Sequence, residues 1–155
     1  MIRVQKEDFD VNHELIILKS GTNNIGGICS FIGLVRDMAK DQEIISMTLE
    51  QYPEMTKKAL EAINKEACSR WPLLGTTIIH RFGKLKPGDQ IVFVAVASAH
   101  REATFQACHF LMDFLKTKAP FWKLEETIDK KKWVSAQISD DLATSRWEKE
   151  NPTKN

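Results

Sequence analysis

The stretch of residues 90–118, QIVFVAVASAHREATFQACHFLMDFLKTK, predicts a buried strand that leads directly into a long amphipathic helix. Residues 90–97 are apolar almost throughout, which is typical of a central strand with both faces covered. From about Glu102 to Lys118 the apolar side chains recur at helical spacing, and Pro120 ends the helix. This strand, this helix and the short junction at residues 98–101 therefore form the expected centre of the fold.

Segments before this centre supply further strands. Residues 76–82 predict a strand that is joined to the central one through the turn sequence KPGD at 86–89. Residues 25–35, IGGICSFIGLV, are apolar, β-branched and rich in glycine. This pattern predicts a buried strand with a close backbone approach at Gly26-Gly27 or at Gly33.

The remaining elements are shorter or lie further from the centre. Residues 38–43 are predicted to be a polar loop, and residues 44–51 to be the strand that pairs with 25–35. Helices are expected at 12–19, at 53–71 and at 139–147, the last with Ser139 as N-cap, and a short strand is expected at 130–137. The predicted fold class is α+β: a single domain over residues 1–147 with a mainly antiparallel sheet packed by two long helices, plus a small C-terminal lobe, and a polar tail at 148–155.

The composition is that of a globular protein with a core of its own. The chain has 155 residues, of which 43% are apolar and 28% charged, and folding at this size buries roughly 70% of the surface. The net charge of +1, from 22 basic and 21 acidic residues, lacks the basic excess of a nucleic-acid-binding protein. No stretch has the ~18 apolar residues of a membrane span, and the N-terminus has no apolar signal core. We therefore expect a cytoplasmic protein that binds neither nucleic acid nor membranes.

The three cysteines, Cys29, Cys68 and Cys108, are far apart in the sequence and form no Cys-x-x-Cys pair. Their spacing fits neither a disulfide framework nor a zinc site, and no other cluster of ligand residues predicts a metal. Each lies in an apolar stretch, so we expect buried free thiols in a reducing compartment. Cys108 could instead be a catalytic thiol, but its position on the apolar helix face favours packing. His80 and His109 are interpreted as structural.

Cationic side chains at the ends of predicted elements are the candidate functional residues: Arg36, His100, Arg101, Lys116, Lys118 and Lys123. Backbone N–H groups at a helix N-terminus favour anions, and an arginine there matches a phosphate or a carboxylate. The same residues also fit a capping turn with a solvated arginine, followed by lysines that stabilise the helix dipole. Desolvation by Phe121 and Trp122 would lower the pKa of a nearby lysine and make it reactive. The residues alone indicate a metal-free pocket for a small anion and no particular reaction.

Six sequence blocks resemble, in order, the large subunit of molybdopterin synthase. They are SFIGLVRD (30–37), LEQYPEMTKKAL (49–60), RWPL (70–73), IIHRFGKLKPGD (78–89), VAVASAHREATFQAC (94–108) and MDFLKTKAPFWK (112–123). The resemblance runs from about residue 3 to residue 147, which is nearly the whole chain. The blocks SAHR and LKTKAPFWK are together the most specific.

This resemblance implies an α/β-hammerhead type of fold and a sulfurtransferase. In that family, cyclic pyranopterin monophosphate receives two sulfurs from a thiocarboxylate on the C-terminal Gly-Gly tail of a small ubiquitin-like subunit. Large subunits form a homodimer that binds two small subunits as a heterotetramer, and no metal or diffusible cofactor is needed. The resemblance implies Lys116 and Lys123 as catalytic residues, and His100 with Arg101 as the pair that binds the pterin phosphate. The full implied substrate-binding set is Leu34, Val35, Arg36, His100, Arg101, Lys116, Lys123, Leu124 and Glu125.

The chain departs from the family pattern at a few positions: Met38-Ala39-Lys40, Leu124, Lys130-Lys131-Lys132, and Gln137, where some relatives carry an arginine for a contact across the dimer. Two other kinds of function also fit the cations. One is a non-catalytic module that binds a nucleotide or an acidic tail, and the other is a structural scaffold for a ubiquitin-like protein. Sulfur transfer is favoured because the cations fall within the family blocks.

Overall fold

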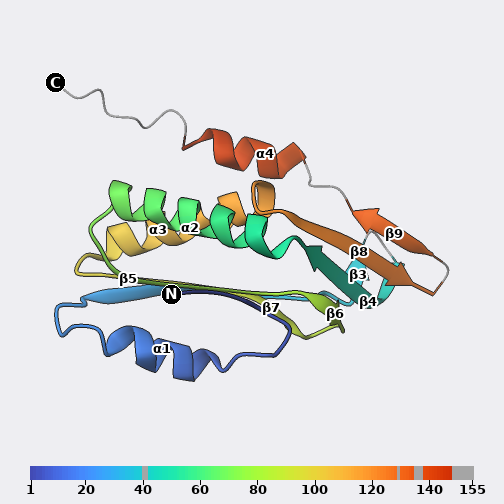
Figure 1. Cartoon of the computed structure of the whole chain (residues 1–155), viewed down its shortest axis with the longest axis horizontal. Coiled ribbons are helices and arrows are strands. Elements are labelled where there is room, and N and C mark those ends of the chain that lie inside the picture. Colours follow the sequence, from blue (N-terminus) through green and yellow to red (C-terminus); the bar gives the residue numbers. More distant parts are fainter. Residues whose placement is uncertain (40–41, 129, 135–137, 148–155) are drawn as a thin grey trace.

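The computed structural model describes residues 1–39, 42–128, 130–134 and 138–147. The elements are, in chain order, β1 (Ile2–Gln5), α1 (Val11–Lys19), β2 (Gly27–Leu34), β3 (Met38–Ala39), β4 (Gln42–Gln51), α2 (Pro53–Arg70), β5 (Leu73–Arg81), β6 (Gly83–Leu85), β7 (Gln90–Ser98), α3 (Arg101–Thr117), β8 (Phe121–Thr127), β9 (Lys131–Val134) and α4 (Ile138–Ser145). The two long helices and the mainly antiparallel pairing confirm the predicted α+β class (Figure 1).

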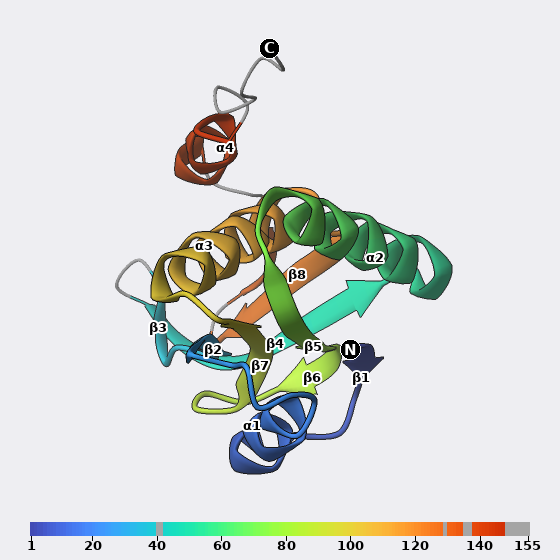
Figure 2. The same cartoon turned by 90° about the vertical axis from the view of Figure 1, so that its left-hand side faces the viewer.

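Strand β7 lies inside a four-stranded sheet of order β1-β5-β7-β2. It pairs antiparallel with β5 and with β2, whereas β1 pairs parallel with β5. Helices α2 and α3 cover one face of this sheet and α1 covers the other (Figures 1 and 2). Along β5, Ile78 therefore packs in the core under α2 and α3, while Ile79 packs in the core against α1. The prediction of a central, doubly covered strand at residues 90–97 is confirmed.

A second sheet is built around β4, in the order β3-β4-β8-β9, with β6 also paired to β4. Strand β4 pairs antiparallel with β8 from Ile44 to Gln51, so the predicted pairing of residues 44–51 with 25–35 is wrong. The sequence does not predict strand β8, because residues 121–127, FWKLEET, directly follow Pro120 and do not alternate regularly between apolar and polar side chains. Part of the predicted loop at 38–43 is also strand, since β3 forms a short ladder with β4.

Strand β2 is an edge strand, which corrects the prediction that it is buried. It pairs with β7 on one side only, and several of its large apolar side chains are 40–52% exposed: Phe31, Ile32 and Leu34. An apolar run predicts a strand, but it does not distinguish a central strand from an edge strand with exposed apolar side chains.

Two glycines of this segment allow close packing against the neighbouring chain. A Cβ on Gly26 would clash with the carbonyl oxygen of Ala99, and one on Gly33 would lie 2.6 Å from Cγ1 of Val92. A Cβ on Gly27 would meet nothing within 4 Å. The predicted close approach is therefore confirmed at Gly26 and Gly33, but not at Gly27.

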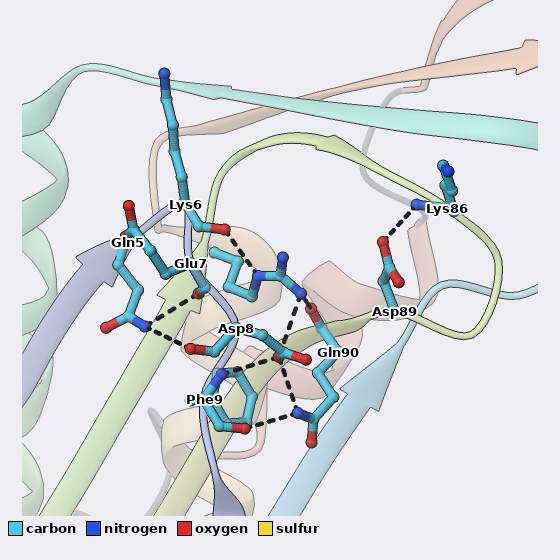
Figure 3. Close-up of polar contacts among 9 residues, drawn as sticks. Gln5, Lys6, Glu7, Asp8, Phe9, Lys86, Asp89 and Gln90 are labelled. Carbon is cyan, nitrogen blue, oxygen red and sulfur yellow. Dashed lines mark hydrogen bonds and ion pairs between the residues drawn. The ribbon is translucent and has the colours of Figure 1, made fainter.

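A polar cluster around Arg81 fixes the ends of β5 and β7. The Arg81 guanidinium donates to the carbonyl oxygens of Lys6 (3.1 Å) and Gln90 (2.9 Å), and it forms an ion pair with Asp8 (3.3 Å). The Gln90 amide donates to Asp8 Oδ1 (2.9 Å) and to the Phe9 carbonyl oxygen (2.8 Å) (Figure 3). The connection from β1 to α1 is thereby bound to both strands.

The C-terminal helix is attached to the main core through Trp147. This side chain is 7% exposed, and its Nε1 donates to Asp113 Oδ2 at 2.8 Å. Its ring meets the rings of Phe110 and Trp71 edge-on, at centroid distances of 5.5 and 5.8 Å. Arg70 donates from Nη1 to the Trp147 carbonyl oxygen at 3.1 Å. The small C-terminal lobe is therefore packed against α2 and α3.

Some predictions near the chain end differ from the structure or lie beyond its description. Helix α4 begins at Ile138, so Ser139 lies inside it and is not its N-cap. The short strand predicted at 130–137 is present as β9. Gln137 and the tail at 148–155 lie outside the described residues.

Candidate functional site

A cavity of about 870 Å³ lies where the two sheets meet beside the C-terminus of α3. Strand β2 and the end of β5 contribute from the first sheet, and β4 and β8 from the second. The lining is largely apolar, with Phe31, Met47 and Leu115 among its members. Its charged members are Arg36, Lys116, Lys123 and Glu125. A mainly apolar cavity with a few convergent charges is typical of a small-molecule site.

The charged groups reach this cavity from three different elements. Lys116 lies in the last turn of α3, where the helix carbonyl groups favour a cation, and Arg36 lies two residues after Leu34, the last residue of β2. Lys123 and Glu125 are two residues apart on one face of β8. Their side chains form an ion pair of 2.8 Å between Nζ and Oε1, which holds the Lys123 ammonium at the wall. The cations predicted at Arg36, Lys116 and Lys123 are therefore brought together.

His80 also lines the cavity, although its sequence context gave it only a structural role. The side chain is 8% exposed, and its ring stacks on Phe121 with centroids 3.7 Å apart and planes inclined by 16°. Its Nδ1 lies 2.8 Å from the Arg81 carbonyl oxygen, so Nδ1 carries the proton and donates it. Burial lowers the pKa of His80 to about 4, and the ring is neutral near pH 7.

His100 and Arg101 lie at the opposite end of α3 from Lys116. Arg101 is the first residue of this helix and Lys116 its last but one. At a rise of 1.5 Å per residue, the helix separates them by roughly 22 Å. Neither His100 nor Arg101 lines the cavity. Within one chain, therefore, the structure does not join the predicted phosphate-binding pair to the lysines.

Two further residues of the predicted substrate-binding set do not line the cavity. Val35 is 3% exposed and packs in an apolar cluster with Met47 and Leu49, which do line the cavity, as does Leu34. Leu124 lies on the opposite face of β8 from the Lys123–Glu125 pair. Lys118 stands over the Phe114 ring at 4.4 Å and is outside the cavity, as expected for a neighbour without a role in the site.

The two aromatic residues of the PFWK segment separate onto opposite faces of β8. Phe121 faces the cavity, whereas Trp122 is 42% exposed and lines a different hollow of about 280 Å³ with Tyr52 and Trp133. The expectation that both rings desolvate a lysine is therefore wrong for Trp122. The strict alternation of side chains along a strand explains this, because β8 was not recognised as a strand.

The cysteines do not contribute a nucleophile to the cavity. All three are free thiols, but Cys68 is exposed and Cys29 is only partly buried, so the expectation that each is buried is confirmed for Cys108 alone. Cys108 is buried, and burial together with the neighbouring Cys29 raises its pKa to about 12. Its thiol therefore stays protonated near pH 7, which agrees with a packing role.

Within the described ranges, no group of three His, Cys, Asp or Glu side chains is placed to hold a metal ion. Over the same part of the chain, no helix is both long and apolar enough to cross a membrane.

Comparison with known proteins identifies relatives over almost the full length. The model of the MoaE protein family matches residues 4–118. The molybdopterin synthase catalytic subunit of Pseudomonas aeruginosa is 52% identical over 147 residues, which covers 95% of this chain and 98% of the relative. That of Escherichia coli is 52% identical over 122 residues, with 79% of this chain and 81% of the relative covered.

Solved structures show the same fold. The MoaE protein of Burkholderia ambifaria superposes with a TM-score of 0.82 and 48% identity, covering 97% of this chain and 99% of the other. A protein–protein complex of subunits 1 and 2 of the molybdopterin-converting factor of Helicobacter pylori contains a chain with a TM-score of 0.72. This chain is 18% identical, covering 88% of this chain and 91% of its own, and the likeness shows a common fold only.

Proposed function

The chain belongs to the MoaE protein family, and we propose that it acts as the catalytic subunit of a molybdopterin synthase, a sulfurtransferase of molybdenum cofactor biosynthesis. The observation that carries this proposal is the convergence of Lys116, Lys123 and Arg36 on one cavity. Lys116 and Lys123 both lie in LKTKAPFWK (115–123), one of the two blocks that resemble the family most specifically, and Arg36 lies in the block SFIGLVRD (30–37). The relatives that bear this name are matched over nearly their whole length.

The proposed substrate is a cyclic pyranopterin monophosphate, and its chemistry suits the cavity. A volume of about 870 Å³ accommodates a molecule of this size, and the apolar wall can receive the ring system. The substrate phosphate and the incoming thiocarboxylate are both anions, which fixed cations stabilise in a partly apolar site. Lys116 and Lys123 are the proposed acid–base groups, because sulfur addition to the pterin requires protons to be moved. Leu34 and Glu125 complete the contacts that the cavity offers.

The proposed partner is a small ubiquitin-like subunit that carries the sulfur as a thiocarboxylate on a C-terminal Gly-Gly tail. A Gly-Gly tail has no bulky side chains, which suits entry into the cavity between the two sheets. The Helicobacter pylori chain of the same fold is part of a complex of two subunits, which agrees with a second subunit as partner.

We also propose a homodimer that binds two small subunits. His100 and Arg101 are roughly 22 Å from Lys116 along α3, so they can bind a phosphate in the cavity only if a second copy contributes them. The support for this arrangement is the placement of two groups of cations at opposite ends of one rigid helix.

The experiment that tests the proposed function compares Lys116→Ala with Lys118→Ala. Purified variants are supplied with thiocarboxylated small subunit and cyclic precursor, and molybdopterin is measured. We expect Lys116→Ala to lower product formation at least about 100-fold, because a positioned acid–base group is lost. Lys118→Ala removes an exposed lysine outside the cavity and should retain activity. Both variants should fold and bind the small subunit.

The outcomes separate the alternatives. Normal turnover by Lys116→Ala would overturn the assigned role of this lysine. The absence of dithiolene product with the wild-type protein would instead favour a non-catalytic binding module. Undiminished binding of a small subunit without its two terminal glycines would favour a scaffold that recognises only the globular face.

A further inference from the structure

His80 lines the cavity, and the roles proposed above for Lys116 and Lys123 leave it without a function. Its Nδ1 is bonded to the Arg81 carbonyl oxygen, and the Arg81 side chain is held by the polar cluster at the ends of β5 and β7. Its ring is fixed from the other side by Phe121. The ring of His80 therefore has one defined orientation in the cavity wall.

The second ring nitrogen, Nε2, is free to act. Among the described residues, none forms a hydrogen bond with Nε2. Nε2 also does not belong to the side-chain atoms that are fully buried and lack a hydrogen-bond partner. His80 lines the cavity, and Nε2 is its ring nitrogen without a hydrogen-bond partner among the described residues. With the proton on Nδ1, Nε2 carries a lone pair and is an acceptor. The structure therefore presents a buried, oriented base to the cavity.

The proposed reaction needs such an acceptor at one step. When the thiocarboxylate sulfur bonds to the pterin, the carbonyl carbon of the carrier tail remains bonded to that sulfur. The carrier can leave only if water breaks this carbon–sulfur bond. The water oxygen adds to the carbonyl carbon, one O–H bond breaks, and the electron pair of the carbon–sulfur bond leaves on sulfur as a thiolate. The carrier departs as a carboxylate and releases its second proton to solvent, so nothing is oxidised or reduced.

We propose that His80 is a catalytic residue whose Nε2 accepts the proton of the water that hydrolyses this acyl–sulfur bond. The inference rests on the proposed function and assigns one further step of it. Phe121, on which the His80 ring lies, and Lys123 share a face of β8 and are roughly 7 Å apart along the strand. His80 and Lys123 therefore lie at one wall, where the base meets the water and the ammonium meets the thiolate.

The other charged groups of the cavity fit this step less well. Lys116 and Lys123 are assigned to the proton transfers of sulfur addition, and the Glu125 carboxylate is already paired with Lys123 at 2.8 Å. The Arg36 guanidinium has N–H donors and no acceptor. The neutral state of His80, which burial favours, keeps its lone pair available near pH 7.

The test is a single-turnover experiment with thiocarboxylated small subunit and cyclic precursor. It uses His80→Asn, which can keep a donor near Nδ1, and His80→Phe, which keeps a ring that can stack on Phe121. Mass spectrometry follows the covalent adduct of small subunit and pterin over time. In both variants we expect adduct formation within about threefold of wild type and adduct decay at least about tenfold slower, because a general base contributes at least this much. The adduct should therefore accumulate.

Each outcome decides the matter. Adduct that forms and decays at wild-type rates in either folded variant overturns the role of His80. Equal slowing of formation and decay also overturns it, because this indicates a role in packing or substrate binding. If the wild-type protein forms neither adduct nor molybdopterin, the proposed function itself fails, and the inference fails with it. Thermal unfolding of each variant identifies those that are folded.

Discussion

At the scale of single residues, the burial of His80 links the stability of the protein to pH. Its pKa is about 4 in the folded state and 6.5 in its ordinary state. Between these two pH values the unfolded chain binds a proton that the folded chain does not. The contribution of His80 to the free energy of unfolding is therefore fully present above pH 6.5 and is lost as the pH is lowered towards 4. From pH 7 to 4.5 this loss amounts to roughly 2–3 kcal/mol. Burial lowers the pKa of His80, and the hydrogen bond to the Arg81 carbonyl oxygen acts in the opposite direction.

Urea unfolding of wild type and His80→Phe at several pH values measures this effect. The difference between the two proteins removes the contribution of every other titrating group. We expect wild type to lose roughly 2–3 kcal/mol more than the variant on acidification from pH 7 to 4.5. Parallel curves for the two proteins would contradict the assignment of a neutral, buried imidazole.

The residues of the cavity differ in how far they could be predicted. Lys116 lies in the last turn of α3 and Arg36 two residues after β2. The boundaries of both elements are set by local sequence, so the places of the two cations followed from it. His80 was missed because its partner Phe121 lies in the other sheet, 41 positions further along the chain. Leu124 belongs to the predicted substrate-binding set together with its neighbours Lys123 and Glu125. The alternation of side chains along β8 places it on the opposite face of the strand from both.

At the scale of elements, helical periodicity and uniform apolarity predicted α2, α3 and β7 to within a few residues, because these signals are local. The pairing of β4 was wrong for the opposite reason. A strand pattern states that a segment is extended, but not which edge it joins, and β4 and β8 are far apart in the chain. The pairing of the strands in the second sheet could therefore not be predicted from the sequence.

The Trp147 side chain, two residues after the end of α4, is buried in the main core, which yields a prediction at this scale. Trp147→Ala removes a 7% exposed ring from the core and leaves the Asp113 carboxylate without its indole donor. We expect a loss of about 3 kcal/mol in the free energy of unfolding, limited by the free energy of detaching α4 alone. Leu142→Ala, at a 68% exposed position of the same helix, should change stability by less than about 0.5 kcal/mol.

Urea unfolding and limited proteolysis measure the two variants together. Trp147→Ala should also make the segment around α4 more sensitive to protease, because the helix loses its anchor on α3. Equal stability and equal protease resistance of the two variants would show that α4 is held by other contacts.

At the scale of the whole molecule, α3 separates two groups of cations, with Arg101 at one end and Lys116 at the other. If each active site combines Lys116 of one copy with Arg101 of another, two inactive variants complement each other. A mixed dimer of Lys116→Ala and Arg101→Ala contains one site with both residues intact and one with neither. Random reassembly makes half of the dimers mixed, so the mixture should recover about a quarter of wild-type activity. The measurement is molybdopterin formation after the two inactive proteins are dissociated and reassembled together, with each variant reassembled alone as control. If both residues served the same site within one chain, no mixture would contain an intact site, and activity would stay at the level of the separate variants.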